Sequence, residues 1–142
     1  MASRAHQLII GLIVRKMRSD GYEIVSFDGN ESLITDISIN APLTIKRHRP
    51  DVIGVDIKNK KICIGEAKTD SDLTSKRTKE QFIDYSNLST KSGGLCELVI
   101  GIPQSSESRL KEILLDLGLI KKSNISLIWM PDEFLPGNED EF

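Results

Sequence analysis

Apolar positions along the chain switch between helical and extended spacing, and the switches predict its secondary structure. Leu8, Ile9, Leu12, Ile13 and Met17 recur at the 3.6-residue period of an amphipathic helix, which we expect over residues 3–18. Similar spacing predicts further helices over residues 76–89 and 107–117. Apolar runs of strand length cover residues 22–27, 33–39, 51–57, 61–67, 95–102 and 124–130.

The clearest local unit is a hairpin made of the runs 51–57 and 61–67, which turns at residues 58–60. Polar stretches at 40–49 and 69–75 predict loops, and Ser92-Gly93-Gly94 is the expected end of the second helix. Trp129 lies in the last apolar run, where core packing is favoured over base stacking. The elements together predict one α/β domain with a mixed sheet.

Length and composition fit this expectation, because 142 residues with 39% hydrophobic and 28% charged side chains suit one folded domain. The seven-residue apolar run from Leu8 to Val14 is too short to span a bilayer, and no signal-peptide pattern is evident, so we expect a cytoplasmic protein.

Cys63 and Cys96 lie in apolar runs and are expected to be buried thiols rather than a disulfide.

Charge is distributed unevenly along the chain, although the formal net charge is only −2. Ten bases and five acids fall between Lys46 and Lys79, a local balance of +5. A basic middle is a candidate surface for a polyanion, and ordinary solvated charge is the alternative. Residues 132–142 carry five acids and no base, which predicts an acidic flexible tail after a domain formed by residues 1–131.

The hairpin carries the residues with the most chemical interest. A turn at 58–60 places Asp51 opposite Glu66 or within two residues of it, and Glu66 and Lys68 project from one face. Charges that extend an apolar stripe are costly unless they are compensated. Two carboxylates beside a backbone carbonyl suit Mg²⁺, and a nearby lysine can orient a water molecule. A simple salt bridge with Lys68 is the alternative.

Pro50-Asp51, fourteen intervening residues and then Glu66-Ala67-Lys68 resemble the motif of the PD-(D/E)XK nuclease superfamily. The segment from Gln81 to Tyr85 resembles the QxxxY element of its RecB-like branch. The layout from about residue 5 to residue 103 is also similar to that of archaeal-type Holliday junction resolvases. The resemblance implies a restriction-endonuclease-like αβββαβ core, whose mixed central sheet is flanked by helices, with a C-terminal αβ addition.

The resemblance also implies an activity: Mg²⁺-dependent hydrolysis of phosphodiester bonds in DNA, with Mn²⁺ as a substitute and a homodimer as an expected form. The nuclease would act either as an endonuclease or as an exonuclease, and its specificity would come from nucleic-acid shape or from a partner. Asp51 and Glu66 would be metal ligands together with the carbonyl of Ala67, and Lys68 would position the attacking water. Gln81 and Tyr85 would line the site or contact the nucleic-acid backbone.

The first predicted helix departs from the pattern, because many members of the superfamily place a glutamate there. This segment has no acid before Asp20, and His6 and Gln7 are the candidates to replace the missing group. An exposed His6 on a fraying first turn is the alternative. Under the same resemblance, two basic groups would flank the site and hold phosphates: Lys46, Arg47 and Arg49, and Lys76, Arg77 and Lys79.

Two other functions stay open at this point. A nuclease fold that has lost catalysis would act as a nucleic-acid-binding module, and the missing acid on the first helix favours that reading. An interaction or assembly subunit would use the acidic tail and the apolar helix against a protein partner. Cleavage assays distinguish the first alternative from an enzyme, and failure to bind any nucleic acid would favour the second.

Overall fold

The computed structural model describes residues 3–27, 39–40, 50–90 and 93–136. Within these residues it has three α-helices: α1 (Arg4–Ser19), α3 (Lys76–Ser86) and α4 (Glu107–Asp116). Short 3₁₀ helices are η2 (Asp70–Thr74), η3 (Gln104–Ser106) and η4 (Asp132–Phe134). The strands are β1 (Glu23–Phe27), β2 (Ile39–Asn40), β3 (Val52–Asp56), β4 (Lys61–Ala67), β5 (Ser89–Thr90), β6 (Glu97–Pro103) and β7 (Ile125–Met130).

Five of the strands form a mixed sheet in the order β1-β3-β4-β6-β7, and β2 pairs with β5 in a separate two-stranded sheet. The neighbours β1, β3 and β4 are antiparallel, whereas β6 runs parallel to β4 and β7 runs parallel to β6. The parallel pairs require crossover connections, which α3 and α4 supply. The expected α/β domain with a mixed sheet is therefore confirmed.

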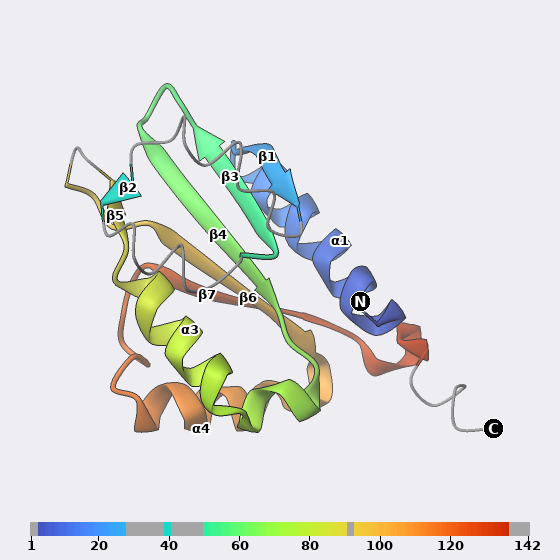
Figure 1. Cartoon of the computed structure of the whole chain (residues 1–142). Helices are drawn as coiled ribbons and strands as arrows, with labels where there is room; N and C mark the ends of the chain where they lie inside the picture. The colour runs from blue at the N-terminus through green and yellow to red at the C-terminus, as the bar shows by residue number, and fades with distance from the viewer. Residues whose placement is uncertain (1–2, 28–38, 41–49, 91–92, 137–142) are drawn as a thin grey trace.

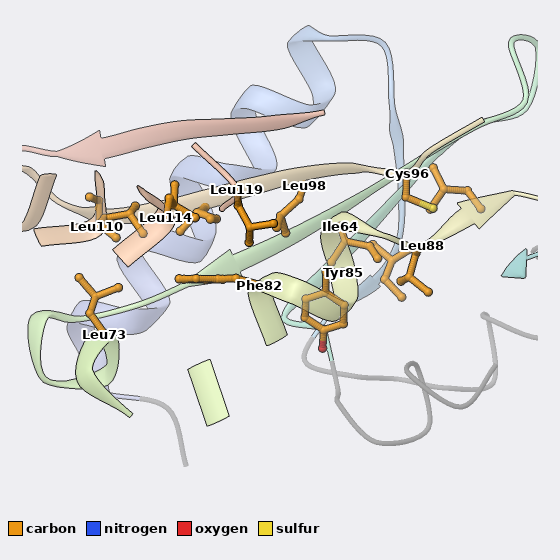
Figure 2. Packing of buried hydrophobic residues seen from close by; sticks show 14 residues of the cluster. Ile64, Leu73, Phe82, Tyr85, Leu88, Cys96, Leu98, Leu110, Leu114 and Leu119 are labelled. Carbon is orange, nitrogen blue, oxygen red and sulfur yellow. The ribbon is translucent and has the colours of Figure 1, made fainter. Parts of the chain in front are cut away.

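Helices cover the two faces of this sheet (Figure 1), with α1 on one face and α3 and α4 on the other. The larger core cluster joins the α3 and α4 side chains to alternate residues of β4 and β6 and to Ile53 of β3. Figure 2 shows Tyr85 and Leu88 beside Ile64, and Leu114 and Leu119 near Leu98. Burial of these large apolar side chains supplies the main driving force for this layer.

The helix α1 packs on the opposite face, where glycines in the sheet let it approach closely. A Cβ at Gly65 would lie 2.6 Å from Cγ2 of Ile13, and one at Gly101 would lie 2.7 Å from Cγ2 of Ile9. These positions therefore accept only glycine while the helix keeps its place. Ser3 caps the start of α1 by accepting from the backbone N–H of His6 at 3.1 Å, which fixes the first turn.

Two helical boundaries differ from the sequence-based expectation. The second predicted helix ends at Ser86 rather than Ser89, because Asn87 turns the chain and its side-chain amide donates to the carbonyl of Ile83 at 2.7 Å. Residues 89–90 then pair with β2. The expected loop at 69–75 contains η2, where the N–H and hydroxyl of Thr69 both donate to Asp72 at 2.9 Å.

The last part of the chain also differs. Trp129 is 41% exposed rather than a core residue, because β7 is the last strand of the sheet. The predicted tail from residue 132 begins with ordered structure: Asp132 accepts from the backbone N–H of Ser105 at 2.9 Å, and Leu135 packs against the α1 layer. Residues 137–142, like 28–38 and 41–49, lie outside the described residues, so the strand expected at 33–39 is seen only at Ile39.

Cys63 and Cys96 are both buried free thiols, as expected, and burial raises the pKa of Cys63 to about 12. Across the described ranges, no helix has the length and apolar character needed to cross a membrane.

Candidate active site

The strand register brings the two predicted carboxylates together at one end of the β3–β4 hairpin. Val52 lies opposite Gly65, so the preceding residue, Asp51, comes next to Glu66. On its other side β4 is held by β6, where Ala67 pairs with Gly101 and the N–H of Lys68 donates to the carbonyl of Gly101 at 2.9 Å. The carboxyl end of β4 is therefore fixed from both sides.

Asp51 is held in place by two donors from different elements. Its Oδ2 accepts from the backbone N–H of Ala67 at 2.9 Å and lies 3.3 Å from Nε2 of His6. Burial alone would raise the pKa of this carboxyl, but the hydrogen bonds with His6, Glu66 and Ala67 hold the pKa below its ordinary value. These donors therefore favour the ionised form of Asp51.

Glu66 is almost completely buried, with 1% of its surface exposed. Burial and the charge of Asp51 raise the pKa of Glu66 well above its ordinary value, against the attraction of Lys68, whose Nζ lies 3.9 Å from Oε2. Its Oε1 has no hydrogen-bond partner among the described residues. A buried acid with an unsatisfied oxygen is costly to the fold, and a cation bound at this oxygen would offset that cost.

The helix α3 supplies two further side chains, one helical turn apart. Oε1 of Gln81 accepts a hydrogen bond from Nζ of Lys68 at 2.5 Å. Tyr85 lies against Glu66, and burial together with the charge of Glu66 raises the pKa of its hydroxyl. Tyr85 was expected either to line the site or to contact the nucleic-acid backbone, and its side chain, which is 0% exposed, agrees with the first of these two places.

The first turn of α1 contributes His6 but not Gln7. His6 is half-buried, its hydrogen bond with Asp51 raises its pKa against the effect of burial, and its Nδ1 is buried without a partner among the described residues. Gln7 is exposed, because the next position on the helix points away from the sheet. Of the two candidates on this helix, only His6 therefore reaches the site.

The six side chains that meet here are called the polar cluster below: His6, Asp51, Glu66, Lys68, Gln81 and Tyr85. All except His6 come from the positions that carried the sequence motif. Asp72 was not expected to contribute, but its charge helps to raise the pKa of His6. The only sequence signal for Asp72 was its place in a polar stretch that was interpreted as a loop.

The predicted phosphate-binding residues are divided between described and undescribed parts of the chain. Lys76, Arg77 and Lys79 are exposed at the start of α3, and the charge of Arg77 acts on the hydroxyl of Tyr85. The other group, Lys46, Arg47 and Arg49, lies outside the described residues. Of the described basic group, Arg77 is therefore the residue whose charge reaches the polar cluster.

The polar cluster has the oxygen donors that a hard cation requires, but not a complete set of side-chain ligands. Among the described residues, no three His, Cys, Asp or Glu side chains form a ready metal-binding group. Asp51 and Glu66 nevertheless direct acid groups toward each other, and the free Oε1 of Glu66 is an unused ligand atom. These two carboxylates and the carbonyl of Ala67 fit Mg²⁺ or Mn²⁺ as a partial ligand set.

Comparison of the chain with protein-family models, curated proteins and solved structures gives no match. The interpretation of the polar cluster therefore depends on its own residues and their geometry.

Proposed function

We propose that the protein is a metal-dependent nuclease that hydrolyses phosphodiester bonds in DNA and acts through a PD-(D/E)XK-type site. The observation that carries the proposal is the meeting of Asp51, Glu66 and Lys68 at one end of a single hairpin. The buried Glu66 has an unsatisfied oxygen beside a second carboxylate, which is unfavourable for stability and useful for holding a cation.

In this proposal Asp51, Glu66 and the carbonyl of Ala67 would hold Mg²⁺ or Mn²⁺. When bound, the ion would neutralise charge on the phosphate and make water a better nucleophile. Lys68 orients the attacking water through its ammonium group, which Gln81 holds in place. Its positive charge also lies close enough to Glu66 to stabilise the ionised carboxylate.

The arrangement of elements supports the same assignment. The series α1, β1, β3, β4, α3 and β6 has the order of a restriction-endonuclease-like αβββαβ core, and α4 with β7 corresponds to the C-terminal addition. In that fold the site lies where the central hairpin ends, and the polar cluster occupies this position. His6 takes the place on the first helix where many members have an acid, and it holds Asp51 rather than adding a carboxylate.

The direct test is incubation of the purified chain with end-labelled single-stranded DNA, duplex DNA, branched DNA and RNA, in Mg²⁺, Mn²⁺ or EDTA. Metal-dependent cleavage of at least one DNA substrate is the expected result. The set also identifies the preferred nucleic-acid structure and distinguishes internal cuts from removal of end nucleotides. Absence of cleavage on every substrate in either metal would contradict the proposal.

A second candidate is a nucleic-acid-binding module without catalysis. The specific observation in its favour is that α1 directs a histidine, rather than an acid, at Asp51. This module would retard DNA in a gel at low salt and leave it intact in both metals. It would use the same basic residues at the start of α3, so binding alone does not separate the two candidates.

A further inference from the structure

The two edges of the five-stranded sheet are built differently. β1 carries the charged Glu23, and its register with β3 shifts between Ile24 and Ser26, as at a β-bulge. β7 has the sequence Ile-Ser-Leu-Ile-Trp-Met and pairs with β6 without any shift. Charges and bulges protect sheet edges from unwanted pairing, because an unpaired strand recruits another strand. Of the two edges, β7 is therefore the one built to receive a strand.

Burial along the two last strands supports this difference. Every residue of β7 is at least partly exposed, whereas β6 is buried from Leu98 to Pro103. The side chain of Trp129 is the most exposed on the strand. An apolar strand that remains half-exposed loses much of the stabilisation that its side chains could supply.

The backbone of β7 also has free pairing groups. The N–H of Leu98 donates to the carbonyl of Asn124 at 2.8 Å, so Asn124 directs its backbone groups toward β6. Alternation along a strand then directs those of Ser126 and Ile128 toward β6, and those of Leu127 and Trp129 toward the outer edge. No other described strand lies along this edge.

We infer that β7 is the dimer interface, where it pairs antiparallel with β7 of a second copy of the chain. The charges on either side of β7 favour a second copy of the chain as the partner, and they favour the antiparallel direction. Lys121 precedes β7 and Glu133 follows it, and both are exposed. Their neighbours have partners within the same copy, because Lys122 donates to Asn87 and Asp132 accepts from Ser105. An antiparallel pair related by a two-fold axis brings the basic flank of each copy to the acidic flank of the other. A parallel pair would place like charges together.

This interface does not cover the polar cluster. The cluster lies at the end of the β3–β4 hairpin, and β6 separates β4 from β7. Pairing through β7 extends the sheet across both copies and keeps the two clusters on separate parts of the dimer. The inference does not depend on the nuclease proposal, since it uses only the edge strand and its flanks.

The test is the mass of the full-length chain in solution, measured by sedimentation equilibrium over a wide range of concentrations. The wild-type chain is expected to be a dimer. Trp129→Lys should raise the dissociation constant about tenfold or more, because it replaces the most exposed apolar side chain of the paired strand with a charge. Ile57→Lys is the matched control: Ile57 is 77% exposed beside the hairpin turn, and its replacement should leave the dimer intact.

A charge exchange tests the direction of pairing without changing the strand. Lys121→Glu and Glu133→Lys should each raise the dissociation constant about threefold at low salt, and the double variant should restore it. A wild-type chain that is monomeric at all concentrations would overturn the inference and leave the nuclease proposal untouched. A dimer that is insensitive to both Trp129→Lys and the single charge reversals would overturn it as well.

Discussion

Nζ of Lys68 donates a hydrogen bond to Oε1 of Gln81, which joins the end of β4 to the buried side of α3 across thirteen residues of chain. The same ammonium lies 3.9 Å from Oε2 of Glu66. A lysine side chain has four rotatable bonds, so two fixed partners greatly reduce its freedom. Gln81 is therefore a positioning residue for Lys68.

This role predicts that Gln81→Met lowers the rate of cleavage about 10- to 100-fold, because Lys68 loses the acceptor that orients it. The effect should appear in kcat and leave KM nearly unchanged. Gln81→Glu keeps an acceptor at the same place and should retain more activity than Gln81→Met. Steady-state kinetics on the preferred substrate provide the check, and a wild-type kcat for Gln81→Met would contradict the role.

Glu66→Gln is predicted to stabilise the protein at neutral pH. The pKa of Glu66 is raised from its ordinary 4.5 by burial and by Asp51, so the folded state binds this proton more tightly than the unfolded state. Its contribution to stability is present below that ordinary value and is lost as the pH rises through the folded pKa. The free energy of unfolding, measured by urea denaturation between pH 4 and pH 9, should fall less with rising pH in Glu66→Gln than in the wild type. Glu112→Gln, at an exposed position of α4, is the control.

His6→Ala is predicted to destabilise the fold by about 1 kcal/mol at pH 6, because it removes the partner of Asp51. The pKa of His6 is raised by Asp51, so the contribution is fully present below the ordinary value of 6.5 and declines as the pH rises through the folded pKa. Thermal unfolding of the wild type and of His6→Ala, at pH 6 and at pH 9, measures how much stability the substitution removes at each pH. Gln7→Ala should have little effect at either pH, and an equal loss for His6→Ala at both would contradict the pairing.

The hairpin and its register could be predicted from sequence because they depend on local signals. A turn at 58–60 fixes which residues face each other, and the alternation along β4 places Glu66 on the α3 face. The motif spacing therefore predicted, without knowledge of the tertiary structure, that Asp51, Glu66 and Lys68 meet at one end of the hairpin.

The features that sequence missed depend on contacts between distant segments. The helix α3 ends early because Asn87 contacts both the carbonyl of Ile83 and the side chain of Lys122. The exposure of Trp129 follows from the position of β7 at the edge of the sheet, which an apolar pattern does not specify. Whether Tyr85 faces DNA or the interior depends on how α3 packs, and periodicity alone allows either.

The basic start of α3 is predicted to contact the phosphate backbone. Replacing Lys76, Arg77 and Lys79 with glutamine should weaken DNA binding similarly for all sequences. It should also flatten the salt dependence by up to about 2 to 3 units on a log–log plot, since each phosphate contact contributes roughly 0.9. The matched control replaces Lys58, Lys60 and Lys61, which are exposed at the hairpin turn. Equal effects of the two triple variants would show that these charges are only solvated surface.

The central claim is tested most directly by cleavage of one labelled DNA substrate with wild-type protein, Glu66→Gln and Lys68→Ala, in Mg²⁺ and in EDTA. The account predicts Mg²⁺-dependent cleavage by the wild type. Each variant should lose at least about 10³-fold in rate while DNA affinity changes little, because these groups act on the transition state and other residues supply the phosphate contacts. Cleavage by both variants at the wild-type rate, or cleavage by the wild type that persists in EDTA, would contradict it.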